Sequence, residues 1–128
     1  MGLDVKIKGL DRENTYHASY IGFAEYRRRI ADAYNKIIGE LYRKTYKEDL
    51  TKEEIEEWNK LCNENLDIFL WHSDCDGKFT PKECKKIYDV LKTLNVDMFY
   101  RKNNITMHEL WLNMFKHCYK RRVNMYFY

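Results

Sequence analysis

The chain has 128 residues, of which 45% are hydrophobic and 16% aromatic, enough for one hydrophobic core, so we expect a single domain over residues 1–128. No stretch approaches the roughly 18 uncharged apolar residues of a membrane span, and residues 1–6 lack the apolar core of a signal peptide, which predicts a cytoplasmic protein without a membrane partner. The 23 basic and 20 acidic residues leave a net charge of +3, well below that of most dedicated nucleic-acid binders, which argues against nucleic acid as a partner.

The two ends of the chain have strand character. Leu3, Val5 and Ile7 alternate with polar residues before Gly9, which is typical of a half-buried strand. Residues 16–21 also favour a strand and are expected to pair with the first one. The last six residues have strand composition as well, so the sequence predicts a small sheet of two or three strands that the carboxyl end closes.

About four helices are expected between these strands. Apolar residues recur at three- and four-residue spacing over residues 23–41. Three further helices begin at capping boxes over residues 51–54, 80–83 and 106–109, where a threonine hydroxyl and a glutamate carboxylate satisfy backbone amides. The second of these boxes also has proline at the first helical position, and the helix that starts at residue 51 runs on to about Phe69. The order of strands and helices predicts an α+β fold.

The run His-Ser-Asp-Cys-Asp-Gly at residues 72–77 is the candidate functional site. Polar groups that converge on a loop between rigid elements are the usual make-up of a ligand site. Turn formation by Asp-Gly and helix capping at residues 80–83 explain part of the pattern. They do not explain why His72, Asp74 and Asp76 crowd into one turn.

The same loop matches the spacing of a calcium-binding EF-hand after its first ligand. With His72 counted first, Asp74 and Asp76 fall at the third and fifth positions, Gly77 at the sixth and Glu83 at the twelfth. Imidazole substitutes poorly for a carboxylate at the first position, and the sequence has no partner loop. If a metal binds, Asp74, Asp76 and Glu83 are the expected ligands, and no other cofactor is expected. Zinc is a weaker alternative without a Cys-x-x-Cys knuckle, and it would use His72, Cys62, Cys75 and Cys84.

Arginine and aromatic side chains could complete a ligand site at this loop. Arg27 begins a run of three arginines on or beside the polar side of the first predicted helix, and arginine grips phosphate through paired hydrogen bonds. Tyr20 and Trp71 could stack on a base. Taken one at a time, arginines on a solvated helix face and aromatic residues in a core explain these side chains better. The predicted ligand-binding residues are Tyr20, Arg27, Trp71, His72, Ser73, Asp74 and Asp76.

No reaction class is indicated by the sequence. It lacks a Gly-x-Ser-x-Gly elbow, a phosphate loop and an HExxH helix. We therefore predict no catalytic residues and favour binding over catalysis.

Three segments resemble a family of small bacteriophage and prophage proteins that have no settled enzymatic role. They are the opening Met-Gly-Leu-Asp, the Gly22-Phe23 step into an arginine-bearing helix, and HSDCDGxxxPxEC ending at Cys84. The likeness touches most of the chain, whereas residues 46–71 depart from the pattern. The resemblance implies a viral context and a site, and it does not imply a reaction.

Small phage proteins of this kind commonly act on host machinery. Our leading hypothesis is an anti-defence protein for immune evasion, a sponge that sequesters a nucleotide-derived immune signal in the host cytoplasm without turning it over. The alternatives are an inhibitor that docks directly on a host defence protein, and an EF-hand-like calcium or other metal-binding module. The sequence leaves self-association open, and a twofold dimer is the commonest arrangement for a homo-oligomer.

Overall fold

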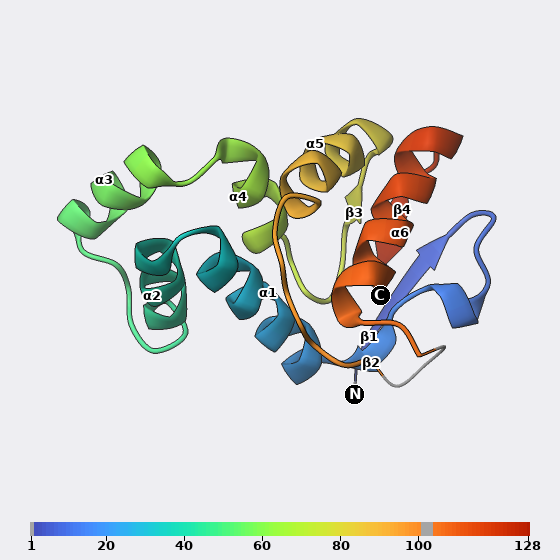
Figure 1. The fold of residues 1–128 in the computed structure, drawn as a ribbon, viewed down its shortest axis with the longest axis horizontal. Coiled ribbons are helices and arrows are strands. Elements are labelled where there is room, and N and C mark those ends of the chain that lie inside the picture. The colour runs from blue at the N-terminus through green and yellow to red at the C-terminus, as the bar shows by residue number, and fades with distance from the viewer. Residues whose placement is uncertain (1, 101–103) are drawn as a thin grey trace.

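The fold is of the α+β class that the sequence predicts. A computed structural model describes residues 2–100 and 104–128, within which the chain forms six α-helices and one four-stranded antiparallel sheet (Figure 1). No helix in these two ranges is long and apolar enough to cross a membrane. In chain order the elements are β1 (Gly2–Ile7), the short 3-10 helix η1 (Arg12–Asn14), β2 (His17–Ser19), α1 (Tyr20–Tyr34), α2 (Lys36–Lys44), α3 (Lys52–Leu61), α4 (Glu64–Leu70), β3 (Lys78–Phe79), α5 (Pro81–Leu91), α6 (Met107–Arg121) and β4 (Met125–Phe127).

The sheet joins the two ends of the chain. Its strand order is β2-β1-β4-β3, so the predicted carboxyl-terminal strand lies between β1 and β3. Leu3, Val5 and Ile7 are buried, as their alternation predicts, whereas Asp4 and Lys6 lie on the opposite face. The sequence analysis did not anticipate β3, because two residues after a glycine turn are too few to show a strand period.

Two of the predicted helices are each divided in two, which is why the chain has six rather than about four. The helix predicted over residues 23–41 breaks at Asn35, whose side chain accepts hydrogen bonds from two amides of the next turn and starts α2. The helix predicted from residue 51 to about residue 69 breaks at Asn63 in the same way and restarts as α4. An asparagine side chain that binds nearby backbone amides favours a helix start over a helix interior.

Side-chain chemistry also sets the starts of the other helices. The capping boxes predicted over residues 51–54, 80–83 and 106–109 all form, and they open α3, α5 and α6. The second strand ends at Ser19, sooner than predicted, because the Ser19 hydroxyl caps α1 and makes Tyr20 its first residue.

Aromatic rings connect the helices to the sheet. Trp111 of α6 is fully buried, with its ring centroid 5.0 Å from that of Phe23 in α1 and 5.8 Å from that of Phe69 in α4. It also lies 6.1 Å from the ring of Phe127 in β4. Figure 1 shows α6 lying across the sheet in a position that agrees with this contact. Such ring pairs add specific geometry to the burial of apolar area, so α1, α4 and β4 hold fixed positions relative to one another.

One buried histidine makes the stability of this core depend on pH. His108 is 7% exposed, and its Nδ1 lies 2.7 Å from the Tyr26 hydroxyl while its Nε2 lies 3.1 Å from the Leu94 carbonyl oxygen. A neutral ring that donates from Nε2 and accepts at Nδ1 satisfies both partners. Burial lowers the pKa of His108, because the charged imidazolium loses its hydration.

We expect the free energy of unfolding to fall as the pH drops below about 6.5, the usual pKa of histidine in an unfolded chain. Below that pH the unfolded chain takes up a proton that folded His108 resists, so acid favours unfolding. Urea unfolding at about pH 7.5 and about pH 5.5 measures the loss, which should shrink in His108→Gln and persist in the control His117→Gln. An equal loss in His108→Gln and the wild type would contradict this assignment.

Candidate functional site

Two segments far apart in the sequence flank an open cavity of about 320 Å³. One is the α1–α2 pair, and the other is the end of α4 with the start of the HSDCDG loop. Five of the seven predicted ligand-binding residues line this cavity. Tyr20 does not, because it precedes Arg27 by seven residues, about 10 Å along the axis of α1. The complete lining is Ala24, Arg27, Tyr42, Thr45, Tyr46, Leu70, Trp71, His72, Ser73 and Asp74.

Arg27 is buried, so its expected place on the polar side of the helix is wrong. It is 7% exposed, and its Nη1 donates to the carbonyl oxygens of Phe69, Leu70 and His72 at 3.3, 3.2 and 2.6 Å. These carbonyls lie at the carboxyl end of α4, where backbone oxygens lack helical partners and a cation is favoured. The guanidinium also lies 4.4 Å from the ring centroid of Phe23.

The positive charge of Arg27 is not balanced by a carboxylate. Among the described residues no Asp or Glu forms an ion pair with it. Its Nε is buried and has no hydrogen-bond partner among residues 2–100 and 104–128. Helix carbonyls carry only partial charges, so they offset the guanidinium charge in part, and Asp74 is the carboxylate that lines the same cavity.

Aromatic rings from both segments line the cavity, Trp71 beside the loop and Tyr42 and Tyr46 from the α2 side. Trp71 is 48% exposed, and its ring centroid lies 5.2 Å from that of Tyr42 and 5.1 Å from that of Trp58. Tyr46 is 44% exposed and carries the Arg28 guanidinium 4.1 Å above its ring. The cavity therefore combines accessible π faces with a second arginine at its edge.

The sequence analysis missed Tyr42 and Tyr46. The predicted helix ended at residue 41, although the four-residue spacing of the two tyrosines, one helical turn, could have signalled a shared face. The Tyr42 hydroxyl donates to the Leu70 carbonyl oxygen at 3.0 Å. Burial raises the pKa of Tyr42, so the phenol stays protonated and serves as this donor.

The His72 side chain contacts backbone oxygens at both ends of the loop. Its Nδ1 lies 2.7 Å from the Ser73 carbonyl oxygen, and its Nε2 lies 3.1 Å from that of Lys78. The imidazole ring packs 4.1 Å from Phe79 and 4.8 Å from Phe127, measured between centroids. Both ring nitrogens thus face oxygens of the chain itself, and the residue acts mainly to position the loop against the sheet.

The two aspartates of the loop lie in different surroundings. Ser73 Oγ accepts hydrogen bonds from the amides of Cys75 and Asp76 at 3.2 and 3.3 Å, which folds the loop into a tight turn. Asp74 lines the cavity, whereas Asp76 is exposed and outside it. No described donor reaches either carboxylate, so Asp74 offers an available acceptor at the edge of the cavity.

Of the candidate metal ligands, Glu83 is hydrogen-bonded within the chain, and Asp74 and Asp76 lie in different surroundings. The carboxylate of Glu83 accepts the Thr80 amide at 2.9 Å in the capping box. Gly77 has a φ of +85°, which suits the sharp turn at the sixth position of an EF-hand loop. Residues 2–100 and 104–128 contain no group of three or more His, Cys, Asp or Glu side chains placed to hold a metal ion. Calcium or zinc binding stays a prediction.

A hydrogen-bonded network at the β1–β2 pair was also missed. His17 Nδ1 lies 2.7 Å from Asp4 Oδ1, and His17 Nε2 lies 2.8 Å from Thr15 Oγ. The hydrogen bond to His17 lowers the pKa of Asp4. The order hydroxyl–imidazole–carboxylate resembles that of an activated nucleophile, but Thr15 is 2% exposed, and its hydroxyl lies within hydrogen-bond reach of two backbone carbonyls. The network therefore links the paired strands β1 and β2.

Comparison with known proteins adds no family to this description. No known family matches the chain, and neither do the curated proteins or the solved structures. The resemblance to phage and prophage proteins accordingly remains a prediction that the HSDCDGxxxPxEC segment supports.

We expect Arg27→Met to lower the free energy of unfolding by roughly 3 kcal/mol, because the carbonyl oxygens of Phe69 and His72 lose their side-chain donor while that of Leu70 keeps Tyr42. The neighbouring Arg28→Met is the matched control, and it should cost less than about 1 kcal/mol, since it loses only an exposed contact with Tyr46. Urea unfolding of both variants measures the difference. Equal losses would show that Arg27 does not hold the end of α4.

Proposed function

We propose that the cavity beside α4 binds a nucleotide-like small molecule, and that the protein is a phage-type anti-defence sponge in the host cytoplasm. The observation that supports this most directly is Arg27. A buried cation without a carboxylate partner stands at the wall of a cavity that exposed aromatic rings also line. An anionic ligand would supply the missing negative charge.

Each part of a nucleotide has a suitable partner in this lining. A phosphate fits the positive potential at Arg27 and the nearby guanidinium of Arg28. A base fits the exposed ring of Trp71, or the face of Tyr46 that Arg28 does not cover, because aromatic stacking tolerates any flat π system. Asp74 is an acceptor for the hydroxyls of a ribose, since a carboxylate accepts from both members of a diol.

The size of the cavity limits the ligand. A volume of about 320 Å³ is at the low end of small-molecule sites, so one nucleotide unit fits and a larger signal would extend beyond the opening.

The surroundings of the polar side chains favour binding over turnover. Both ring nitrogens of His72 face backbone carbonyls, and the Ser73 hydroxyl holds two loop amides. Neither group is therefore placed as a general base or a nucleophile. Sequestration needs affinity alone, and the lining provides a cation, π faces and an acceptor.

Thermal melting with ADP-ribose, a cyclic dinucleotide and inorganic phosphate as separate probes tests this function. A probe present at about 100 times its Kd should raise Tm by roughly 10 °C. Asp74→Ala should remove most of the shift with the two probes that carry ribose and should leave any shift with inorganic phosphate, whereas Asp76→Ala, on the same loop but outside the cavity, should keep the shift with every probe. Heat denaturation should then release the probe chemically intact.

Two results would contradict the sponge. A chemically altered probe would show an enzyme, and no shift with any probe would leave the cavity without a ligand of this class. The same melting series with calcium and with a chelator tests the metal hypothesis, and a Tm unchanged by both would end it.

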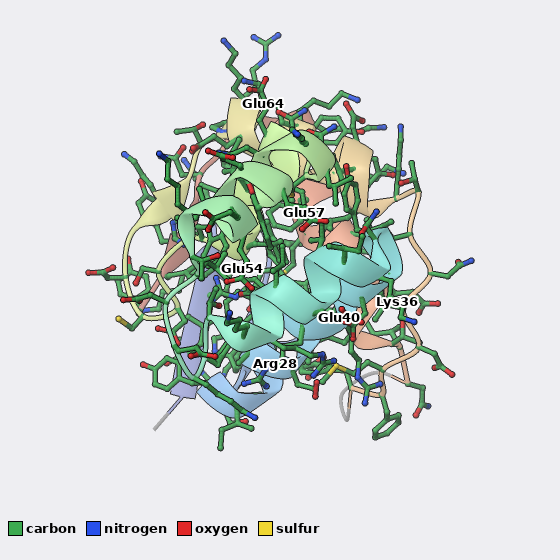
Figure 2. The ribbon with its side chains drawn as sticks, turned by 90° about the vertical axis from the view of Figure 1, so that its left-hand side faces the viewer. Arg28, Lys36, Glu40, Glu54, Glu57 and Glu64 are labelled. Carbon is green, nitrogen blue, oxygen red and sulfur yellow. The ribbon has the colours of Figure 1, made fainter. Side chains whose placement is uncertain are left out.

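The second candidate is direct docking on a host defence protein, which an acidic surface favours. Figure 2 shows Glu40 of α2, Glu54 and Glu57 of α3 and Glu64 of α4 on one side of the molecule. A hollow of about 380 Å³ on these helices is lined by Ile37, Glu53, Glu56, Glu57, Lys60 and Leu61. Ile37 is 41% exposed there, so an apolar contact lies beside three glutamates and one lysine, Lys60.

Docking and sequestration predict opposite mutational patterns. If the protein docks, replacing Glu53, Glu56 and Glu57 by lysine should abolish protection of phage in a host that carries the defence system, and Trp71→Ala should leave protection intact. Sequestration predicts the reverse. Plaque counts with the two variants expressed at equal levels distinguish the two functions, and protection by both variants would contradict both.

A further inference from the structure

A row of alternating lysine and tyrosine crosses the outer face of the sheet. Lys6 of β1 pairs in register with Tyr126 of β4, and Tyr126 pairs in register with Lys78 of β3. Residues directly opposite one another in a sheet project from the same face. Both lysines are exposed and Tyr126 is 40% exposed, while the neighbours Met125 and Phe127 are buried in the core.

Further aromatic and basic groups adjoin this row. Tyr128 is 56% exposed, and the Lys6 ammonium lies 4.8 Å from the centroid of its ring. A hollow of about 420 Å³ next to the row is lined by Lys6 and Tyr126 together with Lys8 and Arg12. We call Lys6, Lys8, Arg12, Lys78, Tyr126 and Tyr128 the tyrosine–lysine face.

Basic side chains predominate on this face, and Asp4 is an acidic exception that keeps its charge. Asp4 lies on the same side of β1 as Lys6, but its carboxylate is hydrogen-bonded to His17 at 2.7 Å. None of Lys6, Lys8 and Lys78 forms an ion pair with a carboxylate of the described residues. The net charge of +3 argued against nucleic acid as a partner. It is a sum over the whole chain, in which the acidic residues of the α3 side offset the basic residues of this face.

We propose that the tyrosine–lysine face binds single-stranded nucleic acid. Adjacent strands lie about 4.8 Å apart, so the two lysines of the row are about 10 Å apart on either side of Tyr126. Their flexible side chains reach phosphates on both sides of a base that stacks on the Tyr126 ring. Open sheets that offer aromatic faces between cations bind single strands in this way, whereas a duplex keeps its bases stacked inside and unavailable.

Fluorescence anisotropy with labelled single strands of about 12 nucleotides, one of DNA and one of RNA, tests the proposal against a duplex of the same sequence. Single strands should bind more tightly than the duplex, and binding should weaken between roughly 50 and 200 mM salt. Tyr126→Ala should weaken binding about tenfold, and Tyr126→Phe, which keeps the ring, should bind like the wild type. A preference between DNA and RNA would identify the kind of strand.

Lysine variants separate this face from general charge attraction. The slope of log K against log salt is negative, and Lys6→Ala or Lys78→Ala should each make it shallower by about 0.7, which corresponds to the loss of one phosphate contact. Lys36→Ala, on the far α2 side of the molecule, removes the same charge and should leave the slope unchanged (Figure 2). Circular dichroism confirms that each variant is folded.

Three outcomes would overturn the proposal: no binding at the lower salt concentration, equal affinity for the duplex, or an unchanged Kd in Tyr126→Ala. The face is separate from the cavity beside α4, so its failure would leave the proposed sponge unaffected, and the converse also holds.

Discussion

The pairing of β4 with both β1 and β3 is the constraint on which the other features depend. It connects the amino-terminal strand to the segment that follows the HSDCDG loop, and the Phe127 amide donates to the Gly77 carbonyl oxygen at 2.9 Å. Phe127 also meets the ring of His72 on one side and the Trp111 core on the other. The buried face of β4 therefore positions the loop, and its exposed face carries Tyr126.

Arg27 provides the corresponding constraint on the helical side. A buried cation is costly unless hydrogen bonds and charge offset the loss of water, and here three carbonyls at the end of α4 do so in part. The same bonds fix where α4 stops and where the loop begins. Burying the guanidinium thus stabilises the helix end and leaves a positive charge at the cavity, so the fold and the proposed recognition of an anion rest on one side chain.

Local chemistry made much of the fold predictable. Strand alternation at Leu3 to Ile7 and the three capping boxes depend on neighbouring residues only, and the structure confirms them. The helix breaks at Asn35 and Asn63 also depend on neighbouring residues only. They were missed because the helical spacing of apolar residues continues across both asparagines. The burial of Arg27 could not be predicted, because its partners come from another helix. Of the site, the sequence indicated the loop, Trp71 and Arg27, whereas the inward turn of His72 depends on the distant Phe127.

The outer strands of the sheet have a consequence for association. β3 has two residues and β2 has three, so each edge presents few backbone amides and carbonyls for another chain to pair with. Lys78 adds a charge to the β3 edge, which further disfavours contact with a neighbouring sheet. The protein thus offers little edge for growth into an extended intermolecular sheet.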